Sequence, residues 1–226
     1  MQVVVTGGNR GLGLELARAY EAGGHTVIVG CRSPAGVTVG EAHPLDMGDE
    51  ASISAFAAAV GDRPVDVLVN NAGLDATGFG TPDSARDAMQ LSGETFLAVM
   101  RVNAVGPMLL TRALAPNLRA ASGAKVLNIS SQVGSMVVAQ RMGRDVSYTS
   151  SKAALNMITV KFASLLKGDG VTVVAMHPGY LRTDMGGPGA DLDPAEAART
   201  IVATVARLGL DQSGSFINWD GSPHPW

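Results

Sequence analysis

The chain of 226 residues is short of cysteine, of charge and of long apolar runs. Its one cysteine, Cys31, excludes an internal disulfide and a thiolate metal cluster. Only 16% of the residues are charged and the net charge is -3, so the sequence has neither the basic field of a nucleic-acid-binding protein nor a polybasic membrane patch. No apolar run reaches the roughly eighteen residues of a membrane span, and no signal peptide is evident. We therefore expect a cytoplasmic protein with no nucleic-acid or membrane partner.

Strand-like and helical patterns alternate along the whole chain, without a linker, an internal repeat or a low-complexity segment. Apolar residues make up 46% of the chain, which at this length supplies a substantial core. The patterns predict strands at 2–5, 26–29, 41–45, 65–69, 124–129, 171–175 and 215–219, and helices at 14–22, 51–60, 91–118, 148–166 and 193–208. We expect one α/β domain over residues 1–226, with a doubly wound, mostly parallel sheet of about seven strands and helices on both faces. Ligands of such sheets bind beyond the carboxyl ends of the strands.

A glycine-rich turn, TGGNRGLG at residues 6–13, follows the first predicted strand and precedes the first predicted helix. Glycine permits a tight turn and a close approach of the backbone to a ligand, and a helix N-terminus offers free N–H groups to a phosphate. The spacing Gly-x-x-x-Gly-x-Gly departs from the dinucleotide pattern Gly-x-Gly-x-x-Gly. The residues alone therefore allow two interpretations, a phosphate-binding loop or an ordinary glycine turn that starts a helix.

The region around the second predicted strand contains no acidic residue, since Asp and Glu are both absent from residues 22–40. The carboxylate that would bind a free ribose 2′-hydroxyl is therefore missing. Arg32 stands after this strand instead, and Arg10 lies in the glycine-rich turn. Guanidinium groups pair well with a 2′-phosphate, so the two arginines favour NADP(H) as the cofactor. The alternative is that both are ordinary surface residues.

Asparagines mark two further positions. Asn71, with Ala72 and Gly73, follows the strand at 65–69 and either lines a ligand cleft or forms a β-turn. In the helix at 91–118, Pro107 has no N–H, so the carbonyl of Asn103 lacks its helical partner. A buried helix with a spare acceptor can hold a water, which makes Asn103 a candidate for a proton relay. The alternative here is a simple helix kink.

Tyr148 and Lys152 lie four residues apart in a stretch of helix formers, and so on one helical face. A phenol beside an ammonium is a candidate general acid, because the positive charge stabilises the phenolate and lowers its pKa from near 10. On a solvated helix face the same pair would have no chemical role. Nearby apolar residues are expected to line a deformable substrate pocket, namely Met136, Val137, Val138, Met142 and Met185.

These motifs together resemble the short-chain dehydrogenase/reductase family, in order and spacing and over nearly the whole chain. The resemblance rests on the glycine-rich turn, residues 70–73 (NNAG), Asn103, Ser130-Ser131, Tyr148-x-x-x-Lys152 and Pro178-Gly179. Within the family, residues 216–221 (FINWDG) and 177–185 (HPGYLRTDM) are similar to the C-factor and Sniffer-type carbonyl reductases. The resemblance implies a Rossmann-type fold and an NAD(P)-dependent oxidoreductase.

The resemblance also implies roles for particular residues. The catalytic set is Asn103, Ser131, Tyr148 and Lys152, with Tyr148 exchanging a proton with the substrate oxygen, Ser131 polarising the carbonyl, Lys152 binding the nicotinamide ribose and Asn103 holding a relay water. The cofactor-binding set is Gly7, Asn9, Arg10, Gly11, Leu12, Gly13, Arg32, Asp46, Asn71, Ala72, Gly73, Tyr148, Lys152, Pro178, Gly179 and Thr183. No metal site is expected. The segment after Thr183 is expected to form a small lid, and His177 to be structural.

The expected activity is NADPH-dependent reduction of the carbonyl of small or medium apolar ketones, aldehydes or quinones. One alternative is an alcohol dehydrogenase that works in the oxidative direction. The other is a nucleotide-binding signalling or regulatory protein with incidental redox activity, against which the full Asn-Ser-Tyr-Lys set argues. The helices around 92–118 and 148–166 are candidates for a homodimer interface.

Overall fold

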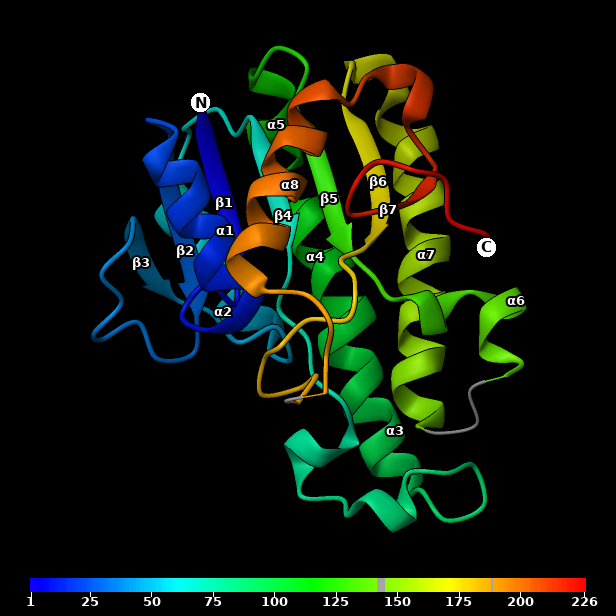
Figure 1. Ribbon diagram of the computed structural model, residues 1–226. Coiled ribbons are helices and arrows are strands. Elements are labelled where there is room, and N and C mark those ends of the chain that lie inside the picture. Colours follow the sequence, from blue (N-terminus) through cyan, green and yellow to red (C-terminus); the bar gives the residue numbers. More distant parts are fainter. Residues whose placement is uncertain (142–144, 188) are drawn as a thin grey trace.

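The computed structural model describes residues 1–141, 145–187 and 189–226. Within these residues seven strands form one sheet in the order β3-β2-β1-β4-β5-β6-β7, and every neighbouring pair is parallel (Figure 1). The strands are β1 (Gln2–Thr6), β2 (Thr26–Cys31), β3 (Glu41–Pro44), β4 (Val67–Asn70), β5 (Lys125–Ile129), β6 (Thr172–His177) and β7 (Phe216–Asn218). The predicted α/β class and strand number are confirmed.

Helices connect the strands and cover both faces of the sheet (Figure 1). The α-helices are α1 (Gly11–Ala22), α2 (Glu50–Val60), α3 (Gly93–Met100), α4 (Gly106–Ala113), α5 (Ala115–Ala120), α6 (Met136–Ala139), α7 (Val146–Leu166) and α8 (Pro194–Arg207). Short 3-10 turns are η1 (Ala76–Phe79), η2 (Asp83–Ala85), η4 (Gln132–Gly134), η5 (Lys167–Asp169) and η6 (Leu210–Gln212). None of these described helices is both long and apolar enough to cross a bilayer.

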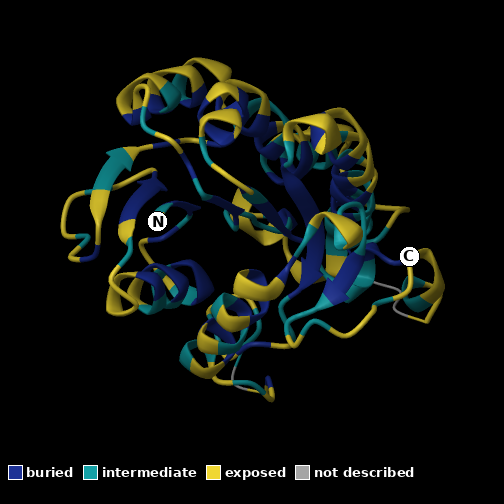
Figure 2. Ribbon diagram, turned by 90° about the horizontal axis from the view of Figure 1, so that it is seen from above, coloured by how far each residue is buried: buried dark blue, intermediate teal, exposed yellow. Residues whose placement is uncertain are grey.

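Two apolar cores flank the sheet, because successive side chains of a strand point to opposite faces. Val3 and Val5 of β1 belong to the core under α1 and α8, whereas Val4 belongs to the core under α2, α4 and α7. Figure 2 shows the result, with buried residues on the sheet and on the inner sides of the helices and exposed residues on their outer sides. Burial on both faces explains why the central strands are nearly continuous apolar runs.

The strand order reverses between β1 and β4. The chain first builds outward from β1 to β3 and then crosses to β4, from which it builds outward in the other direction to β7. Loops that leave neighbouring strands toward opposite faces open a crevice at the carboxyl end of the sheet, and ligands bind in such crevices. The turn from β1 into α1 and the segment after β4 border this point.

The helix predicted at 91–118 is interrupted, as the sequence indicated. Between α3 and α4 the chain forms a π-helical turn, η3 (Arg101–Val105), in which the N–H of Gly106 bonds to the carbonyl of Arg101. Pro107 stands in the first turn of α4, where a missing N–H does least harm. The lack of an N–H at Pro107 thus produces a π turn at Asn103, the kind of helix irregularity often found at functional sites.

Candidate active site

The turn between β1 and α1 has a conformation that depends on glycine. Gly7 and Gly11 have φ angles of 68° and 54°, in the left-handed region that most side chains avoid. A Cβ at Gly13 would overlap the carbonyl oxygen of Gly7 and the side-chain amide of Asn71. The predicted tight turn is therefore present, and its tip at Asn9 and Arg10 is exposed.

The N-terminus of α1 suits an anion. Arg10 occupies the N-cap position and makes no side-chain capping hydrogen bond to the described residues, and the first turn contains no acidic residue. The first N–H groups of a helix have no intrahelical partner, so they are available to a phosphate at the positive end of the helix dipole. Leu12 packs beneath this turn and is 7% exposed.

Asn71 and Ala72 bind the glycine-rich turn through Thr6. The hydroxyl of Thr6 accepts hydrogen bonds from the backbone N–H groups of Asn71 and Ala72, both at 3.0 Å. The side-chain amide of Asn71 donates to the carbonyl of Thr6 at 2.9 Å. The end of β4 thus holds the end of β1 in place. Sequence reasoning assigned no role to Thr6, although a Thr before a glycine-rich turn is a visible hydrogen-bonding position.

The carboxyl ends of β2 and β3 carry the residues expected near the adenosine. Cys31 is buried and burial raises the pKa of its thiol, whereas the neighbouring Arg32 is exposed. Asp46, after β3, is exposed and accepts from the N–H of Gly48 at 2.8 Å. Arg10 pairs with Asp184 at 2.7 Å, and both side chains are largely exposed. The structure therefore brings the tip of the glycine-rich turn against the segment after β6.

Contacts between residues 181–183 and residues 187 and 192 hold the two ends of the predicted lid segment together. A bridge joins Leu181 to Leu192, and the carbonyl of Thr183 accepts from the N–H of Gly187 at 2.8 Å. Thr183 also lies against the glycine-rich turn, since a Cβ at Gly11 would be 3.6 Å from its Cγ2. Gly179, which follows Pro178, has a φ of 88°, so that the chain can turn sharply after β6. Thr183 thus lies against the glycine-rich turn, whereas Gly179 lies near Leu192 and Trp219.

Tyr148 and Lys152 lie on α7 at the carboxyl end of β5. Lys152 is 3% exposed, and its Nζ donates to the carbonyl of Ile129 at 2.7 Å and lies 5.5 Å from the centroid of the Tyr148 ring. A Cβ at Gly73 would be 3.4 Å from Nζ of Lys152 and 3.3 Å from Oδ1 of Asn103. Gly73 after β4, Asn103 of η3 and Lys152 of α7 therefore lie close together around the buried ammonium.

Burial governs the proton affinities of this pair. Burial lowers the pKa of Lys152 to about 8. Burial also raises the pKa of Tyr148 to about 12, while the Ser131 hydroxyl lowers it and the carboxylates of Asp75 and Asp145 raise it further. The predicted lowering of the Tyr148 pKa is therefore wrong in this structure, because desolvation of the phenolate is the largest cause of the shift and the short hydrogen bond of Lys152 is to a backbone carbonyl.

The side chain of Asn103 is fully buried and fully bonded. Its Nδ2 donates to the carbonyl of Leu74 at 2.7 Å and to the hydroxyl of Ser151 at 2.9 Å, and its Oδ1 accepts from the N–H of Leu74 at 3.0 Å. Asn103 thus joins the segment after β4 to α7. Its proposed part in a relay depends on its backbone carbonyl rather than on this side chain.

Ser131 is the N-cap of η4 and follows the buried Ser130. Its hydroxyl accepts from the N–H of Val133 at 3.4 Å, and its effect on the Tyr148 pKa places it beside the phenol. The hydroxyl of Ser130 donates to Oδ1 of Asn156 at 2.6 Å within the core. This bond fixes the end of β5 against α7, so Ser130 and Asn156 position Ser131. Asn156, one helical turn after Lys152, had no role in the sequence analysis.

A cavity of about 510 Å³ lies at the carboxyl ends of β6 and β7 and reaches Gln132, the residue after Ser131. It is lined by Gln132, His177, Gly179, Tyr180, Asp191, Leu192, Asn218, Trp219, Asp220 and His224. His177 is 8% exposed, its Nδ1 has no partner among the described residues, and burial together with His224 lowers its pKa to about 4. His177 is therefore a neutral side chain that borders a pocket, as well as the packed residue that was expected.

This cavity is more polar than the predicted pocket. Of the apolar residues expected to line it, Met136, Val137 and Met185 are 70%, 60% and 52% exposed and do not border it. Val138 does not border it either, and Met142 and Pro188 lie outside the described residues. The reason is that residues 218–224 fold back toward β6 and provide one wall, which a pattern of local apolar residues does not reveal. No cluster of three or more His, Cys, Asp or Glu suited to a metal occurs in the described residues.

Three comparisons place this site among known proteins. A family model described as short chain dehydrogenase matches residues 1–191. The C-signal protein of Myxococcus xanthus is 37% identical over 174 residues, which cover 76% of this chain and 99% of that protein. A 1-hydroxy-2-glutathionyl-2-methyl-3-butene dehydrogenase from Rhodococcus sp. is 30% identical over 239 residues, with 99% of each chain covered.

Solved structures agree over the whole chain. The NADPH-bound carbonyl reductase from chicken fatty liver is 31% identical, with a TM-score of 0.90 and coverage of 100% of this chain and 98% of that one. The carbonyl reductase Sniffer of Drosophila melanogaster is 28% identical, with a TM-score of 0.89 and coverage of 100% and 99%. The similarity therefore includes both the turn after β1 and the start of α7.

Proposed function

The chain belongs to the short-chain dehydrogenase family of oxidoreductases, and from this premise we propose that it is an NADPH-dependent carbonyl reductase with Tyr148 as the general acid. One observation carries the proposal. The glycine-rich turn, Asn103, Ser131 and the Tyr148–Lys152 pair converge at the carboxyl ends of β1, β4 and β5. A dinucleotide in the crevice at this switch point would extend from Arg32 toward Lys152.

The residues at the β1 end fit a dinucleotide that carries a 2′-phosphate. Gly7 and Gly11 leave room for a pyrophosphate at the uncapped N-terminus of α1. Arg32 is exposed at the end of β2, and residues 22–40 contain no carboxylate that would repel a phosphate. Asp46 would meet the adenine, and Pro178, Gly179 and Thr183 the nicotinamide amide. The NADPH in the chicken reductase supports the same preference here.

The α7 end fits the protonation step of a carbonyl reduction. The nicotinamide supplies the hydride when it is bound. Tyr148 donates its proton to the carbonyl oxygen, and its raised pKa keeps the phenol protonated at neutral pH. Ser131 donates a hydrogen bond to the same oxygen and so stabilises the charge that develops there. Lys152 binds the ribose, and Asn103 holds the water through which Tyr148 regains its proton.

The substrates we propose are small or medium apolar ketones, aldehydes or quinones. The cavity at the carboxyl ends of β6 and β7 provides Trp219, Tyr180 and Leu192 as an aromatic and aliphatic surface. Its polar groups, His177 and Asn218 among them, would orient such a molecule. An anionic substrate is disfavoured, because Asp191 and Asp220 line the cavity and no described Lys or Arg does.

Two alternatives stand beside this proposal. The oxidative direction uses the same groups with Tyr148 as a base, and oxidation of an alcohol with NADP⁺ would reveal it. A signalling role is suggested by the likeness to C-signal. The observation that would favour it is binding of NADPH without turnover.

We also propose that the chain forms a homodimer through the outer faces of α3 and α7, where Leu97, Met157 and Leu165 are exposed. Light scattering would measure the mass of the dimer.

The test is NADPH oxidation with cyclohexanone, benzaldehyde and 9,10-phenanthrenequinone, and with pyruvate and xylulose as charged and sugar controls. We expect turnover of at least one apolar carbonyl, and a loss of roughly 10²- to 10⁴-fold in kcat for Tyr148→Phe with little change in NADPH affinity. Tyr180→Phe is the matched control, because it removes a phenol hydroxyl that borders the cavity and has no proposed part in proton transfer. Turnover of Tyr148→Phe at the wild-type rate would remove Tyr148 from the mechanism.

A further inference from the structure

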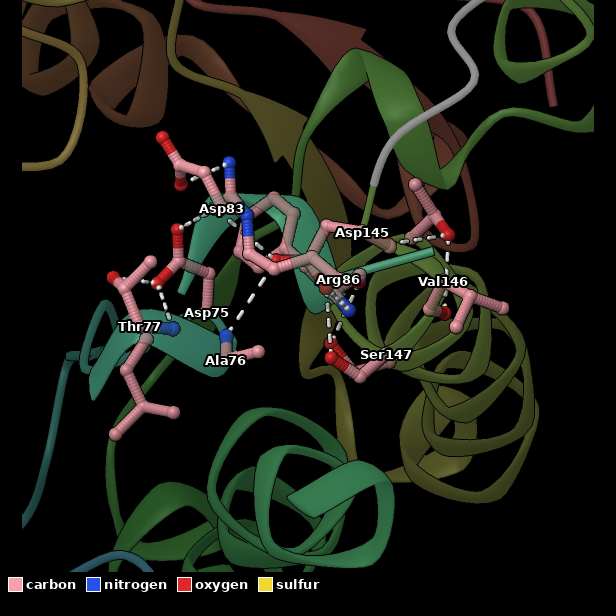
Figure 3. Close-up of polar contacts among 12 residues, drawn as sticks. Asp75, Ala76, Thr77, Asp83, Arg86, Asp145, Val146 and Ser147 are labelled. Atoms are coloured by element: carbon pink, nitrogen blue, oxygen red, sulfur yellow. Dashed lines mark hydrogen bonds and ion pairs between the residues drawn. The ribbon is translucent and has the colours of Figure 1, made fainter. Parts of the chain in front are cut away.

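A group of charged side chains lies between the segment after β4 and the start of α7 (Figure 3). Nη1 of Arg86 is 2.7 Å from Oδ2 of Asp75 and 3.4 Å from Oδ2 of Asp145, and its Nη2 is 3.1 Å from Oδ1 of Asp83. The side chains of Arg86, Asp75 and Asp145 are 17%, 19% and 9% exposed, whereas Asp83 is 72% exposed. The contacts of Arg86 with Asp75 and Asp145 are therefore largely withdrawn from solvent, where ion pairs depend strongly on both partners.

Asp145 is the N-cap of the helix that carries Tyr148. Its Oδ1 accepts from the N–H of Tyr148 at 2.9 Å and from the hydroxyl of Ser147 at 2.7 Å. Its backbone has a φ of 55°, and among the described residues it is the one non-glycine residue with a positive φ. Such a conformation persists only where surrounding contacts hold it. The carboxylate therefore fixes the turn of α7 on which the phenol stands.

Arg86 provides contacts that hold Asp145 in this conformation. Its carbonyl accepts from the N–H of Val146 at 3.2 Å, next to the strained residue. Its guanidinium joins Asp145 to Asp75, whose own carboxylate caps η1 by accepting from the N–H of Thr77 at 3.0 Å. One side chain thus connects the caps of two helices from distant parts of the chain.

The cluster also sets the charge beside Tyr148. The carboxylates of Asp75 and Asp145 raise the pKa of the phenol, after the larger effect of burial. On the other side the described groups that face the ring are the hydroxyl of Ser131 and the ammonium of Lys152. Arg86 lies between the two carboxylates and compensates part of their charge, so its removal leaves them facing the phenol with their charge unopposed.

We propose that Arg86 is a positioning residue for Tyr148: it fastens the N-cap of α7 to the segment after β4 and compensates the negative charge of Asp75 and Asp145. This inference rests on the proposed function, because it assigns Arg86 a role through the phenol of Tyr148. Arg86 does not touch the site at which the carbonyl would be reduced, and its effect passes through the first turn of α7.

The experiment compares wild type with Arg86→Met in both directions, with benzaldehyde and NADPH and with benzyl alcohol and NADP⁺. In reduction at neutral pH the phenol is protonated, so we expect kcat to fall on the order of tenfold through misplacement, with the KM for NADPH unchanged. In oxidation the active form is the phenolate. The rising limb of the kcat–pH profile should therefore move to higher pH by about half a unit to one unit.

Three further variants separate charge from structure. Arg86→Lys keeps the positive charge, so the rising limb of its kcat–pH profile should lie closer to the wild-type position than that of Arg86→Met. Asp75→Asn in the Arg86→Met background removes one uncompensated carboxylate and should move the limb back as well. Asp75→Asn alone should move it below the wild-type position, which tests the effect of the carboxylate even where Arg86→Met fails to fold. Arg119→Met, which breaks the surface pair with Asp169 at 2.8 Å, is the matched control and should change nothing.

Hydrogen exchange supplies a readout that needs no substrate. In Arg86→Met the peptide that contains the Tyr148 N–H should exchange about tenfold faster, because its acceptor on Asp145 is less well held. A wild-type rate of exchange, or lower turnover with an unmoved pH profile, would overturn the role of Arg86. A wild-type protein that reduces no carbonyl at all would instead refute the proposed function, so the two failures are distinguishable.

Discussion

The turn from β1 into α1 and the first turn of α7 lie at the same end of the sheet and are built in opposite ways. In the first, backbone groups form the surface, because the shape of the turn depends on Gly7, Gly11 and Gly13 and α1 has no side-chain cap. The second is made of side chains, with Asp145 as cap and Lys152 buried beside the phenol. A surface of free N–H groups suits a ligand of fixed charge, whereas proton transfer needs groups whose pKa the protein can set.

This difference predicts opposite effects of substitution at the two ends. Added volume should be most harmful at the β1 end, where any side chain displaces backbone. Removal of a charged group should be informative at the α7 end, where burial makes charge costly. Three substitutions test the comparison, in order of decreasing expected effect.

Gly13→Ala should have the largest effect. The added Cβ would overlap the carbonyl oxygen of Gly7 and the amide of Asn71, and neither can move without displacing the turn or its contact with Thr6. We expect a loss of about 1–3 kcal/mol in the free energy of unfolding and at least a tenfold loss in NADPH affinity. Urea denaturation and cofactor titration measure the two. Gly93→Ala, which meets no atom within 4 Å, is the control, and an equal loss there would contradict the argument.

Arg32→Ala should come next. A charge-assisted hydrogen bond to a 2′-phosphate contributes roughly 1.5–3 kcal/mol, so the KM for NADPH should rise on the order of tenfold to a hundredfold and that for NADH little. Arg10→Ala should act in the same direction but less, because Arg10 must first leave Asp184, an exposed pair worth under about 1 kcal/mol. Arg18→Ala removes an arginine paired with Glu15 on α1 and serves as control. A wild-type preference for NADH would refute the assignment.

Lys152→Met comes last because it should raise, rather than lower, the free energy of unfolding. The folded pKa of Lys152, about 8, lies below its ordinary value of 10.5, so below pH 8 the folded protein carries a buried charge that the unfolded chain solvates better. We expect Lys152→Met to raise the free energy of unfolding at pH 7 by about 1–3 kcal/mol, even though carbonyl reduction is lost. The gain should shrink as the pH rises from 8 to 10.5.

Denaturation at pH 7, 9 and 10.5 measures this trend. Lys167→Met, at an exposed position, is the control and should show no gain that depends on pH in this way. A destabilised Lys152→Met at every pH would mean that the hydrogen bond to Ile129 outweighs the cost of burying the charge.

The fold could be predicted from sequence because its determinants are local. β-branched runs, glycine turns and the Asp193-Pro194 cap predicted strands and helices that the structure places within a few residues of the expected ranges, and the carboxylate of Asp193 does accept from Ala195 and Glu196. The motif residues were likewise local, and the parallel topology then brought them to one edge. Their individual roles remain proposals.

Other properties depend on contacts between distant residues and could not be read from the chain. Arg86 and Asp145 are 59 positions apart, and no local pattern joins them. The raised pKa of Tyr148 follows from desolvation and from the carboxylates of Asp75 and Asp145, which the pair Tyr148–Lys152 alone does not reveal. Similarly, residues 221–226 gave no pattern beyond that of a tail, yet the N–H of His224 bonds back to the carbonyl of Phe216 and His224 lines the cavity. Besides Thr6, the Asp three residues before Tyr148 was a local indication that went unused.

The single cysteine has a practical consequence for these two ends. Cys31 is 4% exposed at the end of β2, beside Arg32, and burial raises the pKa of its thiol. A thiol reagent can therefore react only when this edge of the sheet opens, and the rate of labelling converts into a free energy of local opening. Because the chain contains no second thiol, every labelled molecule reports the same edge. Cofactor bound at Arg32 should slow the labelling, whereas a substitution confined to α7 should leave it unchanged.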